Sequence, residues 1–157
     1  MFGTDRNQLR RYYCETWRRH RAGEALEALE QLIAAVIDAH PEYHALLADP
    51  ERALGDEWTP ERGESNPFLH MGMHLGIQEQ VQTDRPAGIR TAWLALARRL
   101  GDAHAAEHAM MEALGEALWE AQRFGTAPDE AKYLARVQAL AGIGPGPFAG
   151  SAQRPRP

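Results

Sequence analysis

The chain has 157 residues, of which 44% are hydrophobic and 25% charged, and its formal net charge is −5. This length supports one domain with a real core but is too short for two. The acidic balance excludes a nucleic-acid binder by overall charge, and no apolar run approaches the roughly 18 residues of a membrane span.

The single cysteine, Cys14, excludes an internal disulfide and suits a reducing compartment. The N-terminal residues 1–13 contain no apolar stretch of the signal-peptide type. We therefore expect a cytoplasmic protein that contacts neither a membrane nor a nucleic acid. Arginines crowd the first helical segment, and this charge run is typical of a solvated helix face, with an anionic partner as the alternative.

Apolar residues recur with helical periodicity along most of the chain, and strand signals are scarce. Six predicted helices cover about 5–20, 24 to the break before Pro41, 67–82, the Pro86 turn to 100, 103–124 and 129–141, and a short helix covers 41–47. Residues 48–66 form the longest predicted loop, and short loops elsewhere favour antiparallel neighbours. We predict an all-α, antiparallel bundle of about five to six helices in one domain, 1–141, and a disordered Gly/Pro-rich tail, 142–157.

Six of the seven histidines form three pairs, each with the same four-residue spacing. They are His40 and His44, His70 and His74, and His104 and His108. This spacing places two side chains on one helix face, as in the zinc-binding HExxH motif. Three pairs about thirty residues apart predict three helices that each bring a pair to a common depth, with a metal site between them. The pair around Pro41 is the weakest, because a proline kink no longer guarantees a shared face.

Carboxylates extend the third pair. Glu112 continues the row of His104 and His108 by one turn, Glu107 lies one step round, and Glu116 is a further turn along. Imidazole suits zinc, iron, nickel or copper, whereas added carboxylate favours iron or manganese. We predict a divalent transition metal, iron first and as two ions, with zinc or manganese as alternatives. The predicted ligands are His40, His44, His70, His74, His104, His108 and Glu112.

The strings HPEYH, NPFLHMGMHLGIQEQ, TDRPAGIR and HAAEHAMMEALGEALWEAQR resemble a bacterial family, domain-of-unknown-function family 1841, over roughly residues 5–125. That resemblance implies no activity. The pattern is also similar, more loosely, to hemerythrin-like bundles, which hold two irons with five histidines and two carboxylates, and to DinB-like bundles, which hold one ion with three histidines. The hemerythrin order of ligand motifs is not reproduced here.

These observations predict a metal-binding helical bundle with a histidine-rich, dinuclear centre. Its predicted function is either oxygen or peroxide chemistry, or the sensing of metal or redox state. Glu107 or Glu116 would then orient a ligand by hydrogen bonding. One alternative is a mononuclear zinc or nickel hydrolase or transferase that uses Glu107 as a base. Another is a non-enzymatic interaction module with structural histidines. The expected partner is a small molecule or dioxygen, and Trp17, Trp93 and Trp119 offer aromatic surface for a homodimer.

Overall fold

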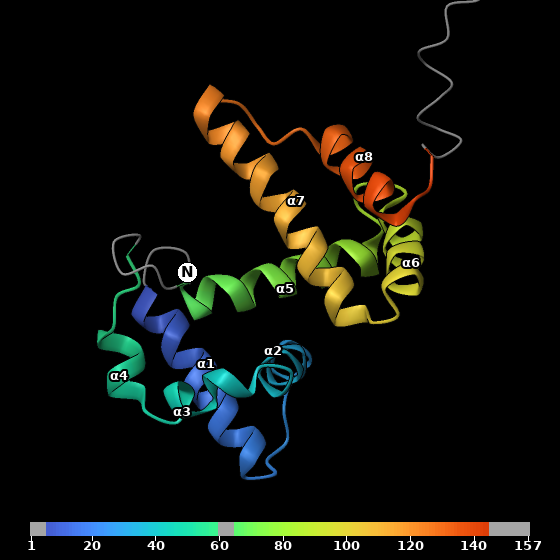
Figure 1. Ribbon diagram of the computed structural model, residues 1–157. Coiled ribbons are helices and arrows are strands. Elements are labelled where there is room, and N and C mark those ends of the chain that lie inside the picture. The colour runs from blue at the N-terminus through green and yellow to red at the C-terminus, as the bar shows by residue number, and fades with distance from the viewer. Residues whose placement is uncertain (1–5, 60–64, 145–157) are drawn as a thin grey trace, which may run out of the picture. The chain divides into compact units, whose positions relative to one another are not determined.

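The structure is a computed structural model that describes residues 6–59 and 65–144. Throughout these residues the chain is helical, with eight α-helices, one 3-10 helix and no strand (Figure 1). The predicted all-α class is therefore confirmed, but the predicted number of five to six helices is too low. Part of the excess comes from α4 (Pro50–Gly55), which lies inside the predicted loop. Asp49 caps this helix by accepting a hydrogen bond from Arg52 N, and Pro50 begins it.

Contacts group the chain into two compact units, residues 1–75 and 76–157, which we call unit 1 and unit 2. Helix α5 (Pro67–Thr83) begins in unit 1 and ends in unit 2. This grouping of contacts does not test whether residues 1–141 fold as one domain, so that remains a prediction. Most of the predicted tail, residues 145–157, lies outside the described residues. None of the helices in the described ranges is both long and apolar enough to cross a membrane.

Unit 1 contains α1 (Arg6–Arg21), α2 (Ala28–Asp38), the 3-10 helix η2 (Pro41–Tyr43), α3 (His44–Leu47), α4 and the start of α5. Aromatic and aliphatic side chains from all the α-helices of this unit build one core. Its buried members are Tyr13, Cys14, Trp17, Ile33, Val36, Ile37, Leu46, Leu47, Ala53, Phe68 and Met71. Ile37, Leu46 and Leu47 of this core flank the segment that carries the first histidine pair.

Arg10 holds α4 against α1. Its guanidinium donates hydrogen bonds to the carbonyls of Ala53 (3.0 Å) and Asp56 (2.8 Å), and only 4% of the residue is exposed. The same group lies 5.1 Å from the ring centroids of both Trp58 and Phe68. The pKa of Arg10 is lowered from its ordinary value, and burial is the largest cause of this shift. Because the charge is buried among carbonyls and aromatic faces, its desolvation is offset by hydrogen bonds and cation–π contacts.

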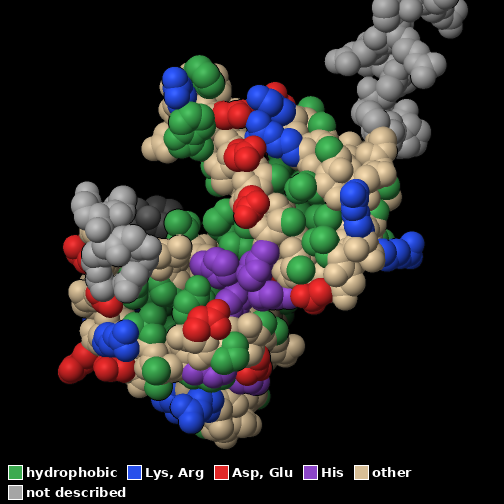
Figure 2. Space-filling view, in the orientation of Figure 1, with side chains coloured by type: hydrophobic (Ala, Val, Ile, Leu, Met, Phe, Trp, Pro, Cys, Tyr) green, Lys and Arg blue, Asp and Glu red, His purple; other side chains and the backbone are tan. Residues whose placement is uncertain are grey.

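Unit 2 contains the end of α5, α6 (Ile89–Leu100), α7 (Ala103–Phe124) and α8 (Glu130–Ala141), and the last three pack on one another. Asp102 and Asp129 cap the starts of α7 and α8 with their carboxylates, as a local N-cap signal predicts. α5 is tied into this unit because the Tyr133 hydroxyl donates to the Gln80 side chain (2.7 Å). At the end of α7, basic and apolar side chains lie together on the surface, with Arg123 5.2 Å from the ring centroid of Trp119 (Figure 2).

Candidate metal centre

His40 lies at the break between α2 and η2. The residue before a proline avoids the α region, and His40 accordingly adopts φ −126° and ψ 71° as the N-cap of η2. Its Nδ1 is 2.7 Å from the carbonyl oxygen of Val36. Since a carbonyl only accepts, Nδ1 carries the proton and Nε2 keeps its lone pair. The backbone break therefore presents a buried imidazole, 2% exposed, in the tautomer that ligates through Nε2.

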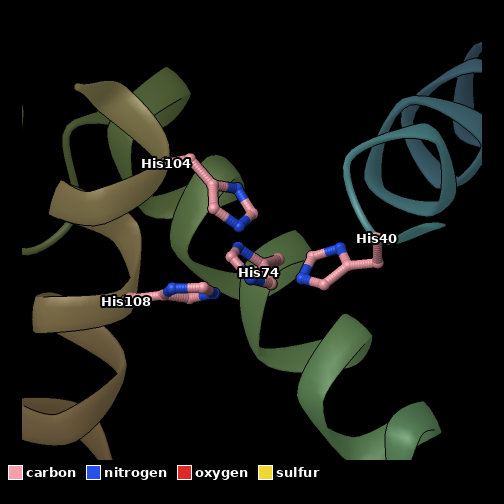
Figure 3. Close-up of side chains that lie close together, drawn as sticks. All are labelled: His40, His74, His104 and His108. Atoms are coloured by element: carbon pink, nitrogen blue, oxygen red, sulfur yellow. The ribbon is translucent and has the colours of Figure 1, made fainter. Parts of the chain in front are cut away.

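Three imidazoles of unit 1 converge at this point. The Nε2 atom of His70 is 3.1 Å from Nε2 of His40 and 3.2 Å from Nε2 of His74. The ligand atoms of His40 and His74 lie within 4.8 Å of each other, and Figure 3 shows the two rings pointing toward one another. His74 is 1% exposed and, like His40, buried, whereas His70 is half-buried. We call His40, His70 and His74 the histidine triad.

The spacing of the triad fits nitrogen ligands on one ion. Two nitrogens held about 2.0–2.1 Å from a metal, at angles of about 90–110°, are separated by about 2.9–3.4 Å. Both measured distances, 3.1 and 3.2 Å, fall in this range. Hydrogen bonds alone match the arrangement less well, because an imidazole nitrogen has either one proton or one lone pair to offer two neighbours. A metal ion would accept a lone pair from every ring.

Tyr43 forms one wall of the triad. Its ring stacks on His40 with an interplanar angle of 7° and centroids 5.3 Å apart, and it meets the edge of His70 at 6.2 Å. Burial, followed by the nearby charge of Glu42, raises the pKa of the Tyr43 phenol above its ordinary value. Tyr43 therefore stays neutral at ordinary pH and holds the ring plane of His40.

His44 does not join the triad, although it belongs to the same sequence pair as His40. Its Nε2 donates to the carbonyl of Ile37 (2.8 Å), and its ring lies 4.4 Å from that of Trp17. The proline break is the cause, because the two histidines leave the chain from different helical segments. His44 is thereby placed against the core beside α1.

The third pair lies at the start of α7 in unit 2. The rings of His104 and His108 have centroids 4.3 Å apart, and both extend from successive turns of the helix, as Figure 3 shows. Their ligand atoms lie within 4.8 Å of one another. Glu107 is held beside this pair, since its carboxylate accepts a hydrogen bond from the Gln78 amide (3.3 Å). Sequence reasoning missed Gln78, although its position one turn after His74 on α5 was a usable signal.

Glu112, the predicted carboxylate ligand, is exposed and lines a shallow groove between α7 and α8. Glu116 lines the same groove and pairs with Arg136 (3.3 Å). The helical row places each successive i+4 residue about 40° further round the axis, so Glu112 has turned away from His104 by about 80°. The carboxylates of this row are therefore directed toward α8.

The family model for a domain of unknown function (DUF1841) matches residues 5–139, and the chain therefore belongs to that family. The resemblance noted in the sequence is thus confirmed over a longer stretch. No curated protein and no solved structure matches the chain.

Proposed function

We propose that this protein binds a transition-metal ion through its histidines. The observation that carries the proposal is the histidine triad, in which the Nε2 of His70 lies 3.1 and 3.2 Å from those of its two neighbours. Burial of His40 and His74 supports it, because buried polar groups require hydrogen-bond partners or a metal. The Val36 carbonyl orients His40, as partners of the non-ligating nitrogen do in metalloproteins.

We propose His104 and His108 of unit 2 as a second pair of metal-binding histidines. Their rings lie on successive turns of α7 with centroids 4.3 Å apart. Glu107, the residue before His108, accepts a hydrogen bond from Gln78 in the same unit. His44 and Glu112 were also predicted as ligands, but their contacts with Ile37 and with the α7–α8 groove favour structural roles.

The donor set favours zinc, nickel or copper. All the side chains of the triad are imidazoles, and these metals accept imidazole readily, whereas iron and manganese favour added carboxylate. A two-iron centre for oxygen or peroxide chemistry is the competing proposal and would require Glu112 or Glu107 as a ligand. In unit 2, Glu107 supports a mononuclear zinc alternative on His104 and His108, because a carboxylate next to such ligands can act as base toward a metal-activated water.

Elemental analysis of untagged protein, together with an absorption spectrum, tests these proposals. We expect at least one zinc, nickel or copper ion per chain, and about two irons with near-ultraviolet absorption would select the oxygen-chemistry alternative. His70→Ala and His74→Ala should lose most of the metal, because each removes a ligand. His20→Ala is the matched control, since His20 pairs with Asp38 (2.9 Å) away from the triad.

Circular dichroism would establish that the variants remain folded. Full metal retention by both His70→Ala and His74→Ala would refute the site, as would wild-type protein that neither contains metal nor takes it up on soaking. Loss from His20→Ala equal to that from His74→Ala would also refute it, because the loss would then not depend on the triad.

A further inference from the structure

Unit 1 also contains a cavity lined in part by Trp17, and this feature is independent of the metal proposal. Helix α1 and the segment formed by α3 and α4 enclose an open cavity of about 790 Å³. Its apolar lining includes Cys14, Trp17, Leu47 and Leu54. This volume falls within the roughly 300–1,000 Å³ typical of small-molecule pockets, which are lined mainly by apolar and aromatic groups.

Arginines surround the apolar lining. Arg11, Arg18 and Arg21 line the cavity and are exposed, so they lie at its mouth, and Glu15 is the acidic residue that accompanies them. Arg18 is engaged, with Glu15 at 2.6 Å and Glu24 at 3.2 Å. These residues give the lining an excess of positive charge in a chain whose formal net charge is −5.

Arg11 and Arg21 are the available cations. Within the described ranges, neither forms an ion pair or a side-chain hydrogen bond. Ten residues separate them on α1, so their Cα atoms lie about 15 Å apart along the helix, and both side chains line the same cavity. A guanidinium recognises carboxylate in a charge-assisted, bidentate geometry, and an apolar surface beside it binds hydrocarbon.

We propose that this cavity, which we call the α1 cavity, binds a free amphiphilic carboxylate. The hydrocarbon of the ligand lies against Trp17 and Leu54, and its carboxylate pairs with Arg11 or Arg21 at one end. The charge of the mouth selects an anion over a neutral amphiphile of the same length. The cavity wall includes Trp17, whose indole would report occupancy by a change in fluorescence.

Titration of the full chain with decanoate, followed by calorimetry and tryptophan fluorescence, tests this assignment. We expect saturable binding of one decanoate per chain and at least tenfold weaker binding of decanol, which lacks the carboxylate. Either Arg11→Gln or Arg21→Gln should weaken the affinity for decanoate about tenfold. The variant that does so identifies the arginine that pairs with the carboxylate. Arg98→Gln on the exposed face of α6 is the matched control and should leave binding unchanged.

Ala48→Trp fills the cavity from an exposed backbone position without removing a core residue, and it should abolish binding while the protein stays folded. Absence of saturable decanoate binding to the wild type would overturn the proposal. Equal binding of decanol, or decanoate binding unchanged in both Arg11→Gln and Arg21→Gln, would also overturn it. A different outcome is that the protein co-sediments with phosphatidylglycerol vesicles through these arginines, with higher affinity than it shows for decanoate. That result would overturn the proposal and identify the α1 cavity as part of a membrane-binding surface.

Discussion

At the scale of single residues, Pro41 decides what the first histidine pair can do. It ends α2, and the two histidines on either side then take different partners. His40 donates to Val36 and presents Nε2 to the triad, whereas His44 donates to Ile37 and packs against Trp17 with the two rings tilted. The same four-residue spacing therefore yields one candidate ligand and one core residue.

This division predicts different phenotypes for two alanine variants. His40→Ala should lose most of the bound metal. His44→Ala should keep its metal but lower the free energy of unfolding by about 1–3 kcal/mol, because it removes a hydrogen bond and an aromatic contact from the core. Metal analysis and urea unfolding of both variants measure the difference. Equal metal loss from the two would show that His44 is a ligand after all.

At the scale of elements, α5 is the helix that carries two triad residues through a glycine-containing stretch. Gly72 and Gly76 lie inside it, and a Cβ built at either position meets no heavy atom within 4 Å. Neither glycine is therefore needed for close approach of a neighbouring helix. Their effect on α5 is local, a loss of helix propensity next to the triad.

Alanine at these positions should stabilise the protein. We expect Gly72→Ala and Gly76→Ala each to raise the free energy of unfolding by about 0.5–1 kcal/mol through helix propensity. The matched controls are Gly101→Ala and Gly125→Ala, whose φ angles of 72° and 65° place them in the left-handed region. In those two variants the free energy of unfolding should fall by about 1 kcal/mol or more. Urea unfolding with a chelator present separates this effect from metal binding, and destabilisation by Gly72→Ala would contradict it.

At the scale of the whole molecule, each unit buries a tyrosine hydroxyl. Burial raises the pKa of Tyr13 in unit 1 and of Tyr133 in unit 2 to about 12, from an ordinary value of 10.0. Both side chains are 3% exposed. The folded state therefore favours the neutral phenol in both cores.

The protein should consequently lose stability in alkali. Below pH 10 both states hold the phenolic protons, and the contribution of the two tyrosines to stability is fully present. Between about pH 10 and 12 the unfolded chain releases them first, so the free energy of unfolding falls. Cys14 adds a similar loss from a slightly lower pH, because burial raises its pKa to about 11 from 9.0.

Urea unfolding at several pH values, with tyrosinate absorbance, measures this effect. Tyr13→Phe should flatten the fall relative to the wild type. Constant stability from pH 9 to 12, or ionisation of Tyr13 near pH 10 in the folded protein, would contradict the prediction.

Local sequence signals were sufficient for most helices. The predicted segments 41–47 and 103–124 agree with the structure, and the Asn66-Pro67 start of α5 is found where expected. Caps, prolines and left-handed glycines act within a few residues, so their effect can be read along the chain. The signal for α4, Asp49 followed by Pro50, is of the same kind, although it lies within the predicted loop 48–66.

The helical class, most helix ends and the concentration of histidines in three pairs can be predicted from the amino-acid sequence, because these depend on local backbone preferences and composition. Which of the paired residues meet depends on tertiary packing. It brings His70 and His74 to His40, turns His44 toward Trp17 and leaves Glu112 on the α7–α8 groove. Such choices depend on how helices distant in sequence pack, and side-chain spacing within one helix carries no information about its neighbour.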